Sequence, residues 1–305
     1  MAVAPSGMVT FFDNSSPGSW AYRTDANGAW AKPDTLSAST TAFGPPQVAF
    51  DAAGNGLAVW RAETVAGLEE ILSSRFTLAT GKWSPASVVP GSQASAAGTD
   101  YERGVPALAM DSEGNAVALW INRKGSGSAE ALMASDCSKV GTWGTPVQVA
   151  PSLLSRPTFD APGLVFDGED FVVAFTATDG HQVGAYTARR SASGASWSSP
   201  ERRQAAGDAA SATRMPRLAG DRRGNLILVW TTGSAPSFKL VYQRYSQGSW
   251  GETKEIPDGT FDNEYFTLSN YPMPLTVNDS GYGALAWGDY DASHRLTKIR
   301  LASFF

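Results

Sequence analysis

Short apolar segments separated by turn residues recur along the chain at a regular interval. The segment that begins at Pro46 holds one apolar run, a turn containing Asp51 and Gly54, and a second apolar run that ends at Trp60. Four further copies begin at Pro106, Pro162, Pro216 and Pro274. A repeat of about 55 residues is typical of propellers and solenoids, in which each copy forms one structural unit.

Each copy predicts two strands joined by a tight hairpin. The turn reads Asp-x-x-Gly-Asn in its fullest form, as in Asp51 to Asn55. Gly supplies a positive φ and the Asp side chain caps the backbone amides of the turn, so we expect a hairpin loop. The uninterrupted apolar run that follows predicts a strand buried on both faces. The expected turn acids are Asp51, Asp111, Asp167, Asp221 and Asp279, and the expected strand aromatics are Trp60, Trp120, Phe175, Trp230 and Trp287.

A second series of tryptophans follows the first at a regular distance. Each stands just after a Gly-containing turn, which we assign to the connection between a third and a fourth strand: Trp30, Trp83, Trp143, Trp197 and Trp250. Of the ten tryptophans, all but Trp20 therefore occupy repeat positions. Large aromatic side chains dominate core burial, so we expect both series to pack between neighbouring sheets rather than to form a platform for ligands.

The pattern predicts an all-β fold, a single β-propeller domain over residues 1–305 with six four-stranded blades. The blades are expected at about 1–45, 46–105, 106–161, 162–215, 216–273 and 274–305. In the first, compressed blade Phe11 takes the aromatic position, and the last blade lacks a fourth strand. Five blades, closed by an N-terminal strand, are the alternative. Residues 203–213 are the one weak helical candidate.

The composition mainly argues against certain classes of structure and partner. Charged residues make up 17% of the chain, with 31 Gly and 18 Pro, which suits many turns and few helices. A net charge of −5 without a basic cluster argues against a nucleic-acid partner. No apolar run approaches the length of a membrane span. We also expect a monomer.

Metal and thiol chemistry are not expected. One cysteine and two histidines argue against an internal disulfide and a zinc site. The Asp-x-x-Gly-Asn turns lack the alternating oxygen ligands of a calcium loop, so we predict no metal and no cofactor. We expect Cys137 to be an ordinary loop residue, and His181 and His294 to be surface loop residues rather than general bases.

The start of the chain, Met1 to Gly7, does not resemble a signal peptide. The composition, rich in Ser, Thr, Gly and Ala and poor in lysine, is closer to that of an exported bacterial protein. We therefore expect a secreted or cell-envelope (periplasmic) location with the leader absent from this chain. A cytoplasmic location is the alternative.

Two of the turns after the third strand resemble a known motif. The segments from Thr24 to Trp30 and from Ser191 to Trp197 resemble degenerate Asp-boxes, the Ser-x-Asp-x-Gly-x-Thr-Trp hairpins of sialidase-like propellers. The Asp-x-x-Gly-Asn unit resembles repeats in exported bacterial proteins of unassigned role. These resemblances imply a propeller fold and do not imply an activity.

The expected site follows from which loops repeat. In a propeller, the hairpins within the first and second strand pairs lie on one face, and the remaining connections lie on the other. The hairpins are regular here, whereas the other connections vary in length and content, so we expect a site on the irregular face around the central channel. The predicted ligand-binding residues are Tyr101, Glu102, Arg103, Arg156, Asp160, Arg214, Asp262, Glu264, Tyr265, Asp289, Asp291 and His294. The loops between second and third strands add Arg61, Glu63, Asn122, Arg123, Asp179, His181 and Tyr290.

These residue types suit a polyhydroxylated or acidic ligand, although polar loops without a site would look the same. Aromatic rings stack on sugar faces, carboxylates accept from hydroxyls, and arginine binds carboxylates bidentately. Arg103, Arg156 and Arg214 each precede an inner strand, and Arg214-Met-Pro216 resembles the Arg-Ile-Pro motif of sialidases, away from its usual N-terminal place. No pair of catalytic carboxylates can be assigned by spacing. We predict non-catalytic binding of a carbohydrate or a protein partner. The alternatives are a sialidase-like glycoside hydrolase and a propeller enzyme acting on a small molecule.

Overall fold

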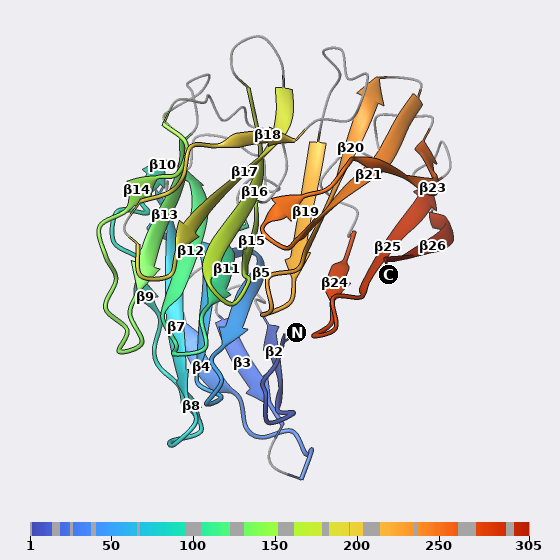
Figure 1. The fold of residues 1–305 in the computed structure, drawn as a ribbon. Coiled ribbons are helices and arrows are strands. Elements are labelled where there is room, and N and C mark those ends of the chain that lie inside the picture. The colour runs from blue at the N-terminus through green and yellow to red at the C-terminus, as the bar shows by residue number, and fades with distance from the viewer. Residues whose placement is uncertain are drawn as a thin grey trace. The chain divides into compact units, whose positions relative to one another are not determined.

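The computed structural model describes residues 2–13, 19–24, 27–37, 41–65, 68–95, 105–122, 131–151, 162–178, 183–194, 196–203, 214–234, 237–261, 273–290 and 296–304. These residues form strands and turns and no helix, so the predicted all-β class is confirmed (Figure 1). Of the candidate helix at 203–213, only Arg203 is described, and it ends a strand. The chain divides into an N-terminal unit, Met1–Val149, and a C-terminal unit, Ala150–Phe305. The single-domain organisation stays a prediction.

The N-terminal unit contains three antiparallel sheets in its described part. The first sheet has the order β1 (Ala2–Val3), β2 (Val9–Asp13), β3 (Ser19–Arg23), β4 (Asp34–Ser37). The second is built on β5 (Thr41–Phe50), β6 (Gly56–Val65) and β7 (Leu68–Thr77), and β7 also pairs with β8 (Lys82–Trp83), β9 (Ser87–Val88) and β10 (Ala94–Ser95). The third has the order β11 (Ala107–Met110), β12 (Ala116–Asn122), β13 (Ala131–Cys137), β14 (Val147–Gln148).

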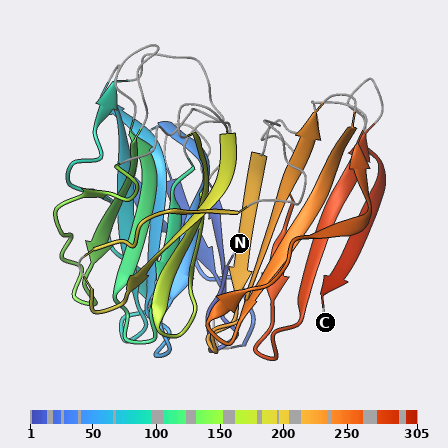
Figure 2. The ribbon, with the colours of Figure 1, turned by 45° about the horizontal axis from the view of Figure 1, so that its top comes forward.

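The C-terminal unit also contains three antiparallel sheets in its described part, seen as the yellow, orange and red strands of Figure 2. Its first sheet has the order β15 (Gly163–Phe166), β16 (Asp170–Thr178), β17 (Val183–Ser191), β18 (Glu201–Arg203). Its second is built on β19 (Arg214–Gly220), β20 (Leu226–Ser234) and β21 (Ser237–Ser246), and β21 also pairs with β22 (Ser249–Trp250) and β23 (Lys254–Phe261). Its third contains β24 (Leu275–Val277), β25 (Gly283–Tyr290) and β26 (Leu296–Phe304).

Among the described residues, the first, third, fourth and sixth sheets are simple meanders, in which strands that follow each other along the chain are hydrogen-bonded neighbours. In the second and fifth sheets, β7 and β21 each pair with more than one later strand. Hairpin connections between consecutive antiparallel strands favour this order. The first sheet holds its own N-terminal strand, since β1 pairs with β2. In the last sheet, the described residues supply three strands, as the sequence predicts. The number of blades, six, stays a prediction.

The Asp-x-x-Gly-Asn turns form the capped hairpins that the sequence predicts. The Asp51 carboxylate accepts hydrogen bonds from the backbone amide of Asn55 at 2.8 Å and from its side-chain amide at 3.0 Å. Gly54 has a φ of 88°, in the region that favours glycine. Asp111 with Asn115 and Asp221 with Asn225 repeat the same bonds. These carboxylates therefore cap the backbone of their own turns.

The last copy departs from the prediction at its turn acid. Asn278, and not Asp279, accepts the capping bonds, from the backbone amides of Ser280 at 2.9 Å and Tyr282 at 3.1 Å. Gly281 has a φ of 79° and stands three residues after the cap, as Gly54 does after Asp51. The capping residue is the one three positions before the turn glycine. Counting five residues from Pro274, as the repeat suggests, gives Asp279 instead of Asn278.

The second-strand aromatics form the core between sheets, which confirms that part of the prediction. Trp60, Trp120 and Trp230 are 0% exposed. Each indole packs with residues of the sheet before it; Trp120, for example, clusters with Leu57 and Val59 of β6. Burial of one such side chain contributes about 2–3 kcal/mol.

Two residues differ from expectation. Trp30 is 58% exposed, because it belongs to the first sheet and its unit has no earlier sheet to pack against. Cys137 is the last residue of β13 and is fully buried, so the expectation of a loop residue is wrong. The run Ser135–Ser138 is polar in sequence, but alternate residues of a strand face the core, and Cys137 is one of them.

Candidate functional site

Most predicted ligand-binding residues lie outside the described residues: Tyr101, Glu102, Arg103, Arg156, Asp160, Asp262, Glu264, Tyr265, Asp291 and His294. The same holds for Arg123, Asp179 and His181. For Arg214, Asp289 and Tyr290 the structure describes the strand backbone and not the side chain. Arg214 pairs with Thr231, at the end of β19 and β20 away from the Asp221 turn. Its strand position is therefore on the loop end, where the sequence places it.

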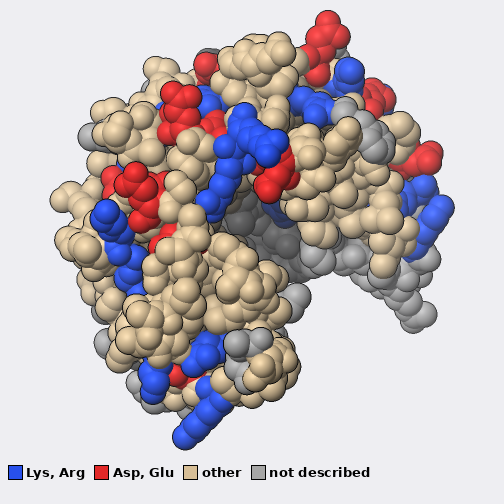
Figure 3. Space-filling model, turned by 60° about the horizontal axis from the view of Figure 1, so that its bottom comes forward, with Lys and Arg blue, Asp and Glu red and all other residues tan. Residues whose placement is uncertain are grey.

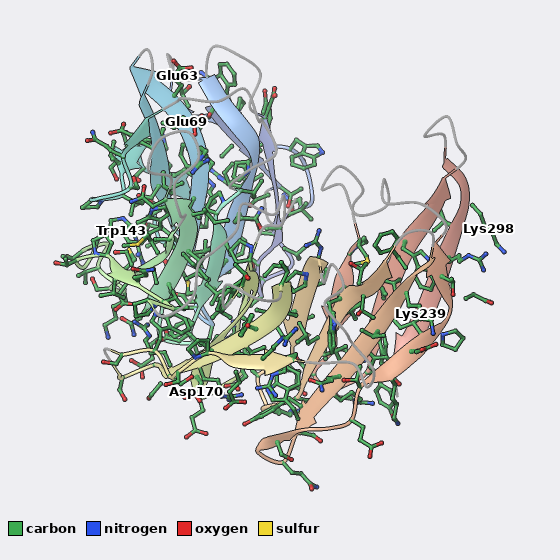
Figure 4. All side chains as sticks on the ribbon, turned by 90° about the horizontal axis from the view of Figure 1, so that it is seen from above. Glu63, Glu69, Trp143, Asp170, Lys239 and Lys298 are labelled. Atoms are coloured by element: carbon green, nitrogen blue, oxygen red, sulfur yellow. The ribbon has the colours of Figure 1, made fainter. Side chains whose placement is uncertain are left out.

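At the loop end of the second sheet, the structure describes the side chains of Arg61, Glu63 and Glu69. Glu63 of β6 lies directly opposite Glu69 of β7. Arg61 lies two residues before Glu63 on β6. Residues two apart on a strand point to the same face, so Arg61, Glu63 and Glu69 share one face of the sheet. We call these three residues the carboxylate corner. Figure 4 shows Glu63 and Glu69 together at one end of the second sheet.

The carboxylate corner contains an ion pair between Arg61 and Glu69. Arg61 Nη1 lies 3.2 Å from Glu69 Oε2, and the two side chains are 6% and 18% exposed. Arg61 Nη2 also donates a hydrogen bond to the carbonyl oxygen of Ile121 on β12 at 3.1 Å. The guanidinium thus joins the second sheet to the third and fixes the Glu69 carboxylate in place. Such partly buried pairs are costly to break by removing one member.

The opposite face of β7 carries a further acid. Glu70 is buried and accepts a hydrogen bond from the side-chain amide of Gln93. The loop end of this sheet therefore offers carboxylates on both faces of the strand pair. Carboxylates accept hydrogen bonds from hydroxyl groups, which is the chemistry that a sugar ligand requires.

The sequence predicts only part of the carboxylate corner. Arg61 and Glu63 are predicted as loop residues of the irregular face, and both lie in the extended end of β6. Glu69, Glu70 and Gln93 are not singled out by any motif. Their relation to β6 depends on the register of the β6–β7 pair, and register depends on the length of the loop that joins the strands.

Clusters of potential metal ligands and membrane-spanning helices are absent from the described ranges. No group of three or more His, Cys, Asp or Glu residues there could hold a metal ion. Among the same residues, no helix has the length and apolar character that a membrane crossing requires. Figure 3 shows Lys, Arg, Asp and Glu side chains interspersed among uncharged ones on the lower face of Figure 1.

Comparison with known proteins identifies the fold. No protein-family model matches the chain, and no curated protein matches it. Several solved structures are similar at low identity. A Hadza microbial sialidase is 17% identical, with a TM-score of 0.50, over 95% of this chain and 65% of the sialidase. An ulvan lyase, a polysaccharide lyase bound to GlcA(1-4)Rha3S, is 11% identical, with a TM-score of 0.53, over 93% and 75%. The Penicillium chrysogenum α-L-arabinanase complexed with arabinobiose is 13% identical, with a TM-score of 0.52, over 99% and 91%.

These similarities, together with the consecutive antiparallel meanders, establish the β-propeller fold that the repeat predicts. At this level of identity they establish the fold and not an activity.

Proposed function

We propose that the protein binds carbohydrate chains through the loop end of its sheets and does not cleave them. The observation that carries the proposal is the Arg61–Glu69 ion pair beside Glu63. The Arg61 guanidinium holds the Glu69 carboxylate through an ion pair at 3.2 Å. A carboxylate accepts hydrogen bonds from sugar hydroxyls but cannot donate the proton that glycoside cleavage requires. The corner is therefore suited to accepting hydrogen bonds from a sugar.

Two further observations support a carbohydrate ligand. The three similar structures are a sialidase, a polysaccharide lyase and an arabinanase, all proteins that act on carbohydrate chains. The segments around Trp30 and Trp197 resemble Asp-box hairpins of sialidase-like propellers. Arg103, Arg156 and Arg214 remain sequence-based candidates for the same face. An extracellular or cell-envelope location of a bacterial protein fits this proposal.

A glycan array run beside a panel of fluorogenic glycosides tests the proposal. We expect binding to at least one glycan class and no turnover. Glu63→Gln should weaken that binding about tenfold, because a charged acceptor contributes about 1.5–3 kcal/mol to a hydrogen bond. Glu113→Gln is the matched control, since Glu113 is exposed in the Asp111 turn at the other end of the third sheet. Equal binding by both variants would exclude the carboxylate corner.

A second candidate, a retaining glycoside hydrolase, is favoured by the pairing of Glu63 with Glu69. Directly opposed residues place their Cβ atoms about 4.5–5.5 Å apart on one face, so the two carboxyl groups lie in the same region without a separation fixed by the pairing. Retaining glycosidases hold their two carboxyl groups about 5–5.5 Å apart. Turnover of a fluorogenic glycoside by the wild-type protein, lost in both Glu63→Gln and Glu69→Gln, would replace the binding proposal with this one.

A further inference from the structure

A groove separates the second and third sheets of the N-terminal unit, at the opposite end from the carboxylate corner. Its volume is about 670 Å³. One wall is the end of β7 with the hairpin that follows it, and the other wall is the hairpin that follows β13. The hairpins that form these walls are regular in sequence, which indicates a scaffold role. The sequence therefore does not predict this groove.

The charged side chains that line the groove are all cationic. They are Arg75, Lys82 and Lys139, and no Asp or Glu lies in the lining. Arg75 donates to the carbonyl oxygens of Ser138 at 3.1 Å and Lys139 at 2.7 Å, which satisfies its hydrogen bonds without neutralising its charge. Within the described part of the chain, the Lys82 and Lys139 ammonium groups form no hydrogen bond or ion pair. Cationic side chains on both walls favour the binding of an anion between them.

The two walls are held at a fixed separation by bonds that cross between the sheets. Arg75 reaches from β7 to the hairpin carbonyls of the third sheet. Trp143 reaches in the other direction, and its indole Nε1 donates to Ser73 Oγ at 3.2 Å. Trp143 is labelled at the edge of the N-terminal unit in Figure 4. A ligand would therefore meet a preformed site, which lowers the entropy cost of binding.

Three hydroxyl groups of the lining donate to backbone carbonyl oxygens. Ser74 Oγ donates to the carbonyl oxygen of Ser84 at 2.6 Å, and Thr80 Oγ1 donates to that of Thr77 at 3.2 Å. Ser84 Oγ donates to the carbonyl oxygen of Pro85 at 3.1 Å. Ser74 is buried, whereas Thr80 and Ser84 are exposed. Ser84 Oγ also accepts from the backbone amide of Arg75 at 3.1 Å, and Thr80 and Ser84 each retain acceptor capacity for the donating hydroxyls of a sugar. Cations for an acidic group and acceptors for hydroxyls are thus present in one groove.

We propose that this groove binds the acidic groups of an anionic polysaccharide, either sulfate esters or carboxylates. Lys82 and Lys139 contact the anion, and Arg75 adds its charge while it joins the sheets. An inorganic anion would use the cations and leave the hydroxyl acceptors unpaired. The proposal uses no residue of the carboxylate corner, so its success or failure is independent of binding at the loop end.

Calorimetric titration of the full chain tests the proposal with three polymers: dextran sulfate, polygalacturonate and neutral dextran. We expect at least one of the two anionic polymers to bind and neutral dextran not to bind. Lys82→Gln/Lys139→Gln should weaken the binding about tenfold or more, since hydrogen bonds to charged groups are the strong ones. Binding of dextran sulfate alone would identify a sulfate site, and binding of polygalacturonate alone would identify a carboxylate site.

The matched control is Lys254→Gln/Lys298→Gln. These two lysines are exposed on β23 and β26 of the C-terminal unit and, in the described residues, also form no ion pair. Both double variants lower the net charge equally, so a general effect of charge would weaken binding in both. The proposal is overturned if the two double variants bind alike or if neither anionic polymer binds. Binding of neutral dextran that Lys82→Gln/Lys139→Gln weakens as much as binding of the anionic polymers would also overturn it, because the groove would then not select an acidic group.

Discussion

Asp221 shows how a single side chain links a turn to the pH dependence of stability. Burial raises the pKa of Asp221, but hydrogen bonds from the side chain and backbone of Asn225 and from the backbone of Arg223 outweigh burial. The net result is a lowered pKa. A lowered pKa means that the turn stabilises the fold above the unfolded value of about 3.9 and loses this contribution as the pH falls through the folded value.

Asp221→Asn should preserve the hairpin, because Asn278 caps the last turn with its side-chain oxygen. We expect a loss of about 1 kcal/mol in the free energy of unfolding at pH 7, since a charged acceptor becomes a neutral one. Between pH 4 and pH 2 the difference from wild type should shrink as Asp221 takes up a proton. Urea denaturation at several pH values measures this. Asp279→Asn is the control and should change nothing, and a difference independent of pH would contradict the assignment.

Cys137 is a buried thiol beside a cation. Burial raises the pKa of Cys137, and the nearby Arg75 guanidinium lowers it by less, so the net shift is upward. The thiolate is the reactive form of cysteine. We expect native protein at pH 8 to react with iodoacetamide about a hundredfold more slowly than protein in urea, as measured by mass spectrometry. Equal rates in the two states would show that Cys137 is accessible.

At the scale of the strand, the buried indoles are held by packing rather than by hydrogen bonds. In the described structure, the indole N–H groups of Trp60, Trp120 and Trp230 have no acceptor. The equivalent position in another copy is occupied by Phe175, which is also buried. The position therefore requires a large aromatic ring and makes no use of the indole nitrogen.

Trp120→Phe should consequently cost much less than Trp120→Ala. We expect about 1–2 kcal/mol for the Phe variant and about 3–5 kcal/mol for the Ala variant, because only the second leaves a large cavity. Chemical denaturation of both variants measures the difference. Trp30→Ala serves as the control, since that side chain is 58% exposed and should contribute little. Equal losses for the two Trp120 variants would imply a role for the indole nitrogen.

The strands and hairpins were largely predictable, because they depend on local chemistry. Turn glycines, capping acids and buried aromatics each act within a few residues or on the adjacent sheet. Asn278 was missed because an amide caps a turn as well as a carboxylate does. The exposure of Trp30 was missed because the repeat does not reveal which copy lacks a neighbour in its unit.

At the scale of the whole molecule, the site was harder to predict than the fold. The carboxylate corner arises from the register between β6 and β7, and the groove arises from the separation of two sheets. Neither quantity follows from a motif in one segment. The contrast between regular and irregular loops draws attention to Arg61 and Glu63 and away from Lys82 and Lys139, and the binding role of all four residues stays a prediction.

The net charge of the molecule sets the conditions for binding at the groove. The chain carries a net charge of −5 at pH 7 and has an isoelectric point near 5.1, so at neutral pH the protein as a whole repels a polyanion. Between pH 7.5 and pH 5.5 this repulsion decreases, whereas the groove lysines and the sulfate groups of dextran sulfate remain charged. At constant ionic strength, we expect the affinity for dextran sulfate to rise about three- to tenfold over this range.

Lys82→Gln/Lys139→Gln should bind more weakly than wild type by a similar factor at both pH values, because the variant lacks the local cations and shares the global charge change. Titration calorimetry of the two proteins at each pH measures both effects. An affinity that falls on acidification would contradict the expected effect of net charge. A variant that matches wild type at pH 5.5 would mean that net charge alone governs the binding. The groove would then not be the binding site. Arg75, Lys82 and Lys139 would contribute only as part of the surface charge of the protein.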